Sequence, residues 1–239
     1  MLKAEKLSKS YGERKVLENI SLEIPEGNFI SLLGPSGCGK STLLRILSRL
    51  DEPTSGNVQF GVRARERAFV FQDPTLLPWL TVRENVEFPF KLMHERPDGV
   101  NEVLAKVGLS NSQNLFPYQL SGGMRMRTSI ARALVTKPRL LFMDEPFSAL
   151  DEATRFELQE DLYELWSKEK VTVIFVTHSI SEAVYLSDRV LVMSPKGNGI
   201  SWEQNIKLPQ LRGAELRTHY EFNAHVELLS QKLRSVKYV

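Results

Sequence analysis

The chain has 239 residues, 42% of them hydrophobic and 25% charged, a composition that excludes a disordered chain and a fibrous repeat. Its 31 Lys and Arg residues nearly balance its 29 Asp and Glu residues, which argues against a dedicated nucleic-acid-binding protein, and its single cysteine excludes an intramolecular disulfide. There is no run of about 18 apolar residues, and the charged start lacks the apolar stretch of a signal peptide, so we expect a cytosolic, soluble, globular protein.

The chain begins with short, rather polar strand patterns over residues 2–22, for which we expect an antiparallel edge sheet. Beyond them, nearly unbroken apolar runs alternate with helical patterns, and such runs are typical of parallel strands buried on both faces. The runs cover residues 29–33, 68–71, 140–143, 171–176 and 190–193, and the helical patterns cover residues 40–50, 121–136, 152–168 and 179–186. The alternation predicts an α/β fold around a parallel sheet.

The loop after the first apolar run carries a phosphate-binding pattern. It consists of Gly34, Pro35, Ser36, Gly37, Cys38, Gly39, Lys40, Ser41 and Thr42. These residues match G-x-x-x-x-G-K-[ST] between a strand and a helix, where inward-pointing N–H groups and the helix dipole favour anions. We predict that Lys40 reaches the β- and γ-phosphates of a nucleotide, that Ser41 ligates Mg²⁺ and that Thr42 binds the α-phosphate. A glycine-rich turn without a ligand is the less favoured alternative, and Cys38 fits as a small loop residue rather than a redox group.

The strand signal disappears between residues 73 and 138, where prolines interrupt helical patterns such as residues 100–107. This predicts a helical insert in the α/β core. Within the insert, the helix expected at residues 121–136 opens with Ser121, Gly122 and Gly123. Ser121 is a favourable N-cap, and the two glycines allow the backbone to approach a phosphate closely. Because this helix start lies in the insert, it has little reason to lie near its own phosphate loop, and a second copy of the protein could supply it instead.

Two polar positions follow buried strands at the same end of the predicted sheet. Asp144 and Glu145 end the apolar run at residues 140–143, and we assign Asp144 to Mg²⁺ or its waters and Glu145 to the general base that polarises the attacking water. His178 follows the run at residues 171–177 and could contact the γ-phosphate or orient the base and the water. Alone, each would be more typical of a solvated turn or a structural histidine, but together with the phosphate loop they favour a catalytic site.

The end of the chain carries a weaker pattern. After Pro195 we expect a turn at residues 196–199, a short strand and a helix at residues 214–235. On this helix one apolar stripe would contain Leu216, Tyr220, Leu229 and Leu233.

Taken in order, these motifs resemble those of the ATP-binding subunits of ABC transporters over essentially the whole chain. The resemblance makes residues 34–42 the P-loop, 120–123 the signature, 140–145 the Walker B strand, 148–151 the D-loop and His178 the switch histidine. It adds Gln72, which matches the Q-loop glutamine with a catalytic and a Mg²⁺-binding role, and Tyr11, which matches the aromatic residue that stacks on adenine. The family's frequent residues are replaced at Met124, Met126 and Ser179, none of which the chemistry needs.

The resemblance implies a P-loop NTPase fold of RecA-like type, with an antiparallel β edge subdomain and an inserted helical signature subdomain. A single domain would cover residues 1–239, with its core at 1–72 and 139–205, the insert at 73–138 and a C-terminal extension at 206–239. The resemblance also implies a head-to-tail homodimer, in which two ATP molecules with Mg²⁺ each lie between the P-loop of one copy and residues 121–123 of the other.

Residues 73–82 and 116–119 are similar to those of the nitrate, sulfonate and taurine importer group. This implies an ATP-hydrolysing energy-coupling subunit for the import of small anions, peripheral on the cytoplasmic face of the cell membrane. Its partners would be permease subunits and, indirectly, a solute-binding protein. Around residues 72–81, four apolar side chains either line a groove for a helix of the permease or pack on the insert, and we weigh the two nearly evenly. They are Leu76, Leu77, Trp79 and Leu80.

Three other functions are less well supported. A soluble ATPase of the same superfamily that acts on nucleic acid or ribosomes usually carries two ATPase domains or long coiled-coil arms, and this chain shows neither. A nucleotide switch that barely hydrolyses would not need Glu145 and His178. A GTPase would carry an Asn-Lys-x-Asp motif, which does not occur.

Overall fold

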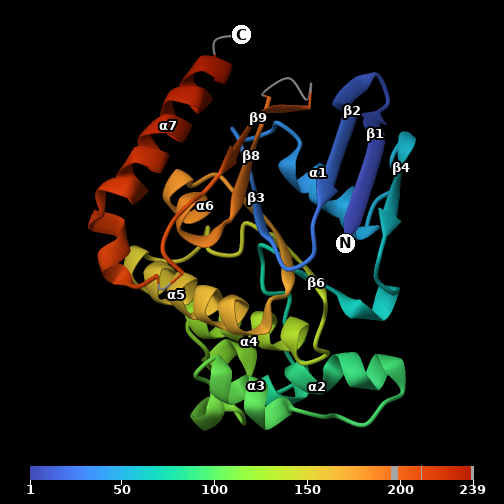
Figure 1. Ribbon diagram of the computed structural model, residues 1–239. Coiled ribbons are helices and arrows are strands. Elements are labelled where there is room, and N and C mark those ends of the chain that lie inside the picture. Colours follow the sequence, from blue (N-terminus) through green and yellow to red (C-terminus); the bar gives the residue numbers. More distant parts are fainter. Residues whose placement is uncertain (195–198, 211, 238–239) are drawn as a thin grey trace.

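The computed structural model describes residues 1–194, 199–210 and 212–237. Its main sheet, to which β3, β6, β8 and β9 in Figure 1 belong, has the strand order β5-β6-β7-β3-β8-β9. The strands are β3 (Phe29–Leu33), β5 (Arg67–Val70), β6 (Leu140–Asp144), β7 (Thr172–Thr177), β8 (Arg189–Met193) and β9 (Ile200–Asn205). All neighbours pair in parallel except β8 and β9, which are antiparallel. The predicted α/β fold around a parallel sheet is therefore confirmed.

A second, antiparallel sheet has the order β2-β1-β4. It consists of β1 (Leu2–Tyr11), β2 (Arg14–Ile24) and β4 (Ser55–Phe60), so it confirms the antiparallel sheet expected at residues 2–22 and adds a third strand. The strands are more polar because only one face is covered: Leu2, Ala4 and Leu7 of β1 are buried, and Lys3 and Lys6 between them are exposed.

Both faces of the main sheet are covered, which explains its unbroken apolar strands. On one face, Ile30 and Leu32 of β3 share an apolar cluster with α1 (Lys40–Ser48) and the three-stranded sheet. On the other face, Phe29 and Leu33 share a cluster with the remaining α-helices. These are α2 (Val82–Met93), α3 (Val100–Lys106), α4 (Gly122–Leu134), α5 (Glu152–Glu169), α6 (Ile180–Leu186) and α7 (Tyr220–Lys237). Each buried Leu, Ile or Phe contributes about 1.5–3 kcal/mol, so both layers stabilise the sheet.

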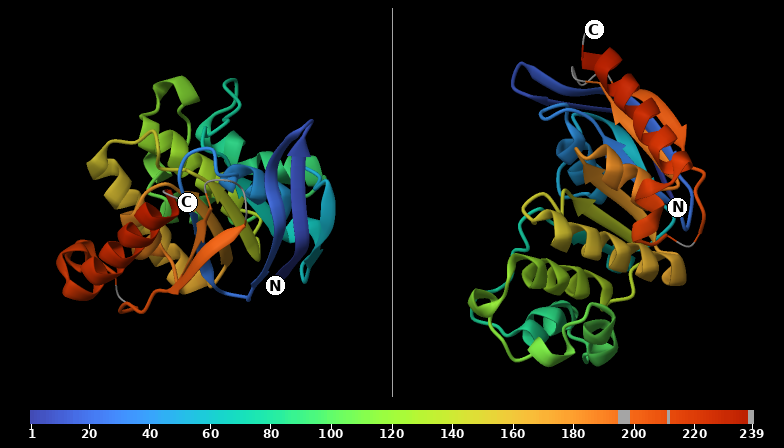
Figure 2. Two further views of the ribbon diagram at one scale, coloured as in Figure 1. Left: turned by 90° about the horizontal axis from the view of Figure 1, so that it is seen from above. Right: turned by 90° about the vertical axis from the view of Figure 1, so that its left-hand side faces the viewer.

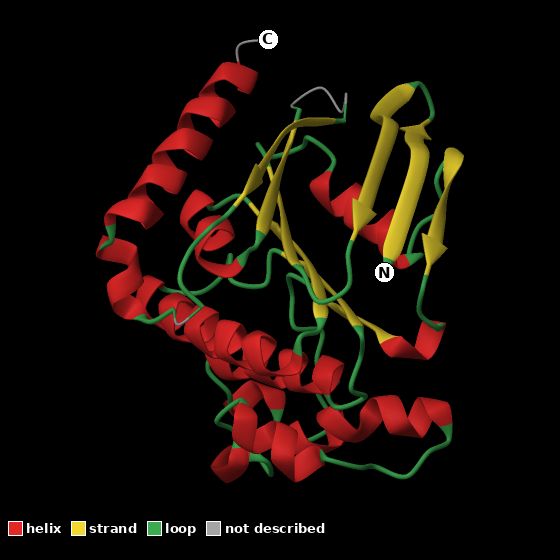
Figure 3. Cartoon of the chain, in the orientation of Figure 1, coloured by secondary structure: helices red, strands yellow, loops and turns green. Residues whose placement is uncertain are grey.

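Between β5 and β6 the chain contains helices and turns but no strand, and these helices gather at one end of the molecule (Figure 3). α2 begins at a capping box, in which Glu84 N donates to Thr81 Oγ1 and Thr81 N donates to Glu84 Oε2. The fully buried Asn85 side chain accepts from Leu77 N and donates to the carbonyls of Leu77 and Leu80. These bonds hold the loop before α2 against the helix.

The predicted C-terminal helix is interrupted at His219, whose extended backbone separates a 3₁₀ turn (Ala214–Thr218) from α7. Leu216 and Leu229 are buried as predicted, and Leu233 packs on the core. Tyr220 is 86% exposed, so its predicted place in the stripe was wrong: the stripe assumed one continuous helix. α7 lies on the side of the molecule away from β1 and β2 (Figure 2). The predicted turn at residues 196–198 lies outside the described residues, and among the described helices none is long and apolar enough to span a bilayer.

Candidate active site

The phosphate loop connects β3 to α1 at the carboxyl end of the main sheet. Gly37 and Gly39 have positive φ angles of 79° and 97°, a region that side chains avoid, so glycine is favoured at both positions. A β-carbon on Gly39 would also lie 2.7 Å from Leu17 Cδ2, because β2 packs closely on the loop. Gly39 is the N-cap of α1 and has no side chain to offer the helix, which leaves the first N–H groups of α1 for an anion.

The Lys40 side chain is only 5% exposed and folds back over this loop. Its Nζ donates to Gly34 O at 3.0 Å and to Pro35 O at 3.1 Å, and lies 3.7 Å from Glu145 Oε1. The ammonium group is thus held by the loop and faces the carboxylate at the end of β6. Of the other predicted loop residues, Ser36 is exposed, Thr42 is half-buried and Cys38 is buried, and burial raises the pKa of the Cys38 thiol, which fits a packing role.

Ser41 and Asp144 meet below the loop. Ser41 Oγ donates to Asp144 Oδ1 at 2.8 Å, and Asp144 is 4% exposed. Burial raises the pKa of Asp144 above its usual value, although the hydrogen bond from Ser41 and the nearby Arg45 oppose this. A buried carboxylate beside a hydroxyl is a pair of hard oxygen ligands of the kind that Mg²⁺ prefers, so these residues fit the predicted ion.

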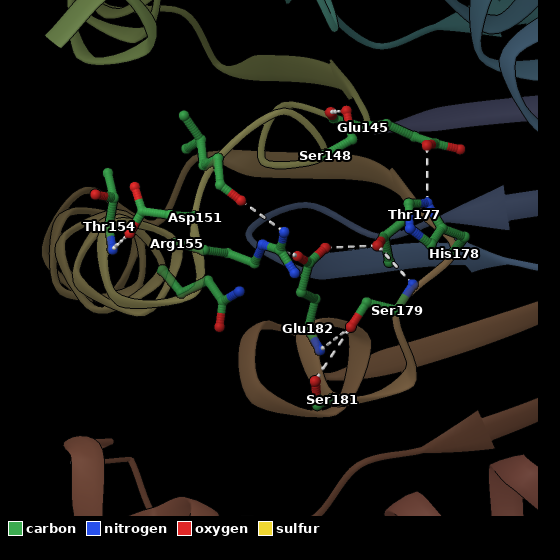
Figure 4. Close-up of polar contacts among 12 residues, drawn as sticks. Glu145, Ser148, Asp151, Thr154, Arg155, Thr177, His178, Ser179, Ser181 and Glu182 are labelled. Atoms are coloured by element: carbon green, nitrogen blue, oxygen red, sulfur yellow. Dashed lines mark hydrogen bonds and ion pairs between the residues drawn. The ribbon is translucent and has the colours of Figure 1, made fainter. Parts of the chain in front are cut away.

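Glu145 and His178 come together at the ends of β6 and β7 (Figure 4). His178 Nδ1 lies 2.9 Å from Glu145 Oε2, while Glu145 Oε1 faces Lys40. The backbone of Glu145 has a positive φ of 43°, uncommon outside glycine. It is held there because Glu145 N donates to Val176 O at 3.0 Å and Ser148 Oγ donates to Glu145 O at 2.9 Å. The structure therefore fixes one carboxylate between a histidine and the phosphate loop.

Gln72 follows β5 and is exposed, and its Nε2 donates to Ser148 Oγ at 3.2 Å. It borders an open groove of about 600 Å³, which Asp144 and Gly122 also line. The structure thus places Gln72 near Asp144, with its amide bound to the loop after Glu145.

The signature residues lie apart from the phosphate loop. Ser121 is the N-cap of α4, where its Oγ accepts from Met124 N at 3.2 Å, and Ser121 and Gly122 are exposed. α4 and α1 belong to the clusters on opposite faces of the sheet, and among the described residues no hydrogen bond or ion pair joins residues 121–123 to residues 34–42. Gly123 has a packing reason as well, because a β-carbon there would lie 2.6 Å from Thr154 Cγ2 of α5.

Tyr11 ends β1 and is 52% exposed. Its hydroxyl donates to Asp51 Oδ2 at 2.6 Å, and this bond raises the pKa of Tyr11. Lys9 Nζ lies 4.8 Å from the centre of the ring. The ring is therefore tethered at its polar end, while Tyr11 stays exposed, as a stacking residue needs.

Sequence reasoning missed the residues that support these side chains. Asp51 is one, and Arg155 and Glu182 are two others. Arg155 lies four positions after Asp151, and Glu182 lies four positions after His178. In each case the earlier residue was singled out from the sequence, and the later one lies on the helix that follows it. That shared spacing, one helical turn, was the available signal.

The chain was compared with known proteins. The family model described as "ABC transporter" matches residues 17–148. An aliphatic sulfonates import ATP-binding protein of Bacillus cereus is 42% identical, over 92% of this chain and 90% of that protein. The protein of the same name from Pseudomonas putida is 43% identical, over 87% of this chain and 78% of that protein.

Solved structures agree with the sequence relatives. A dimeric ATP-binding cassette in a post-hydrolysis state, bound to ADP and phosphate, superposes with a TM-score of 0.77 and 34% identity, over 87% of this chain and 100% of that one. The cbiO1 protein of Clostridium perfringens, described as part of an ABC transporter complex, gives a TM-score of 0.78 and 26% identity, over 100% of this chain and 98% of that one. The chain therefore belongs to the ABC transporter family, as one of its ATP-binding, ATP-hydrolysing subunits.

Proposed function

We propose that this chain is the energy-coupling subunit of a membrane importer for small anions, of the aliphatic sulfonate type. The observation that carries the ATPase part is the carboxylate of Glu145, held by His178 at 2.9 Å and facing Lys40 at 3.7 Å beside a phosphate loop. The sulfonate part is supported by the names of relatives that are 42% and 43% identical.

In the proposed reaction the loop residues 34–42 bind the phosphates of ATP through backbone N–H groups, and Lys40 neutralises the β- and γ-phosphates. Tyr11 stacks on the adenine. Ser41 and Asp144, with Gln72, are the residues that would hold Mg²⁺, which when bound neutralises charge on the phosphate oxygens.

Glu145 accepts the proton of the attacking water, and His178 keeps its carboxylate oriented. The hydrogen bond to His178 Nδ1 and the held backbone of Glu145 leave this carboxylate little freedom, which favours a fixed geometry for attack. Gln72 Nε2 donates to Ser148 Oγ, so Gln72 contacts the loop that follows Glu145.

A homodimer completes this site. Ser121 and Gly122 are exposed at the start of α4, with α1 on the opposite face of the sheet, so a second copy placed head to tail would bring them to the γ-phosphate. We also propose that residues 1–239 form one domain, with its core at 1–72 and 139–205, the helical insert at 73–138 and a C-terminal extension at 206–239.

The permease would bind at the loop after Gln72, which puts the chain on the cytoplasmic face of the cell membrane, with a solute-binding protein as an indirect partner. In this loop Trp79 is 69% exposed, whereas Leu76, Leu77 and Leu80 are half-buried and Leu76 packs on the core. Of the two arrangements weighed from the sequence, packing holds for Leu76, whereas Trp79 is exposed as a residue that lines a groove would be. Asn85 donates to the carbonyl of Leu80, and Arg132 donates to the carbonyls of Thr75 and Pro74. These hydrogen bonds hold the backbone of the loop in place, so the exposed Trp79 has a fixed position.

The test compares Glu145→Gln with the wild type. The variant keeps the size of the side chain but cannot accept the proton, so ATP turnover falls by about 100-fold or more while ATP binding persists. Turnover is measured by phosphate release, and binding by a fluorescent ATP analogue. In cells that lack the chain, the wild type restores sulfonate uptake and the variant does not.

Glu203→Gln is the matched control. Glu203 lies on β9, away from the site, and pairs with Arg189 of β8 at 3.2 Å. The variant keeps both turnover and uptake. Wild-type turnover in Glu145→Gln would refute the base assignment, and normal sulfonate uptake without the chain would refute the transport assignment.

A further inference from the structure

A carboxyl group next to the site has no part in the phosphate chemistry. Glu182 lies in α6 and is 5% exposed. Its Oε2 accepts from Thr177 Oγ1 at 2.5 Å, and its Oε1 lies 3.8 Å from Arg155 Nε of α5 (Figure 4). Burial raises the pKa of Glu182, while the hydroxyl of Thr177 and the charge of Arg155 lower it. Burying a carboxylate such as that of Glu182 costs stability, so its presence beside the site suggests a functional role.

One end of this contact reaches the switch histidine. Thr177 immediately precedes His178, and Thr177 Oγ1 also accepts from Ser179 N at 3.0 Å. Ser179 in turn caps α6 by accepting from Glu182 N at 3.3 Å. The residues on both sides of His178 are thus bound, directly or through Thr177, to the first turn of α6.

The other end reaches the loop 148–151. Arg155 Nη2 donates to Leu150 O at 2.7 Å, directly before Asp151, which caps α5 by accepting from Thr154 N at 3.0 Å. At the start of the same loop, Ser148 accepts from Gln72 and donates to Glu145 O. The loop therefore touches the residues after β5 and β6, and Arg155 links it to those after β7.

We propose that Arg155 and Glu182 are positioning residues that tie the loop 148–151 to His178, so that the two move as one unit. The inference rests on the proposed function, in which a second copy binds at residues 121–123. Leu150 of the loop adjoins these residues, because a β-carbon on Gly122 would lie 3.6 Å from Leu150 Cδ2. When a second copy closes on the loop, the link sets Thr177 and His178, and His178 sets the carboxylate of Glu145. Without the link, ATP still binds and the copies still associate, but the base is not held for attack.

The experiment separates positioning from simple stabilisation. Glu182→Gln keeps the shape and an oxygen for Thr177 but loses the charge that faces Arg155. We expect kcat for ATP to fall by about 10-fold with KM within about 2-fold, the pattern of a lost contribution to the chemical step. Arg155→Lys keeps the positive charge but loses the planar fork that reaches both Leu150 O and Glu182, and it gives the same split.

Two further measurements make the result specific. In the background of Glu145→Gln, which traps ATP, Glu182→Gln still dimerises with ATP, because the link acts after association. The double variant Arg155→Lys/Glu182→Gln loses little more activity than either single variant, since both break one link. If Glu182→Gln folds poorly, Thr177→Val removes the same hydroxyl contact with a side chain of the same shape.

Glu160→Gln is the control. Glu160 lies on α5, as Arg155 does, but it pairs with Arg217 at 2.8 Å, away from the loop 148–151. The variant keeps kcat. The proposal is overturned if kcat in Glu182→Gln, Arg155→Lys and their double variant stays at the wild-type value, if KM rises in place of the fall in kcat, or if the two substitutions add independently. Each of these outcomes requires an active wild type, so an inactive wild type would instead refute the proposed function.

Discussion

At the scale of single residues, Asp144 shows a conflict between stability and function. Its pKa is raised in the folded chain, chiefly by burial. The folded state then binds the proton more tightly than the unfolded state, so stability is lost as pH rises from the ordinary Asp range through the raised pKa. Above the raised pKa the full penalty is present. Asp144→Asn removes it and keeps an oxygen for Ser41, so we expect the variant without nucleotide to unfold at a higher temperature.

The size of this change is set by the domain, in which 1 kcal/mol corresponds to about 2–4 °C. Thermal unfolding at pH 7, with and without Mg²⁺ and ATP, measures it. The variant gains less than the wild type from Mg²⁺ and ATP, because it lacks a carboxylate ligand. An Asp144→Asn protein that is less stable alone, or that gains as much from Mg²⁺ and ATP, would contradict this account.

Sequence patterns indicated several side chains that the structure brings together at the candidate site, but not the residues that contact and support them. Lys40, Asp144 and His178 each belong to a short motif made of one strand and the residues at its end. A local sequence pattern is enough to identify such a motif. The contact between Arg155 and Glu182 depends on how α5 and α6 cross, and no local pattern encodes that crossing. Asp51 could not be predicted either, because it meets Tyr11 across 40 positions of the chain.

At the scale of elements, strands buried on both faces were the most predictable. β3 has five buried residues of five, so its apolar run marks both its place and its bounds. β4 has a single buried residue, Val58, and shows no periodic pattern, so it was missed. The helix at the C-terminus was predicted without its break at His219, since an extended residue there is compatible with a helical pattern on either side.

The contact between α4 and α5 gives a test at this scale. A β-carbon on Gly123 would lie 2.6 Å from Thr154 Cγ2, closer than atoms can approach. Gly123→Ala therefore pushes the start of α4 away from α5, and we expect a loss of about 1–3 kcal/mol, the usual cost of overpacking. Denaturant unfolding measures it.

Gly122→Ala is the paired control, because its β-carbon would lie 3.6 Å from Leu150 Cδ2, an ordinary contact. Its stability stays within about 0.5 kcal/mol of the wild type. Thr154→Ser, which removes the methyl group, restores much of the stability that Gly123→Ala loses. Equal losses in the two alanine variants, or no rescue by Thr154→Ser, would show that this close approach is not the reason for glycine.

At the scale of the whole molecule, the two halves of the proposed nucleotide site belong to different parts of the core. α1 and the phosphate loop lie with the cluster on one face, and α4 with its exposed Ser121 lies with the cluster on the other. Gly122 lines the same groove as Asp144, but among the described residues no hydrogen bond or ion pair joins residues 121–123 to residues 34–42, so one copy does not join its signature to its own phosphate loop. Two copies related by a two-fold axis can do so, and each then completes the other.

The mass of the Glu145→Gln protein in solution tests this most directly. With Mg²⁺ and ATP, sedimentation equilibrium should give twice the chain mass of 27.2 kDa, and removal of ATP should return the single-chain value. A protein that binds ATP yet keeps the mass of one chain at all concentrations would contradict the shared site.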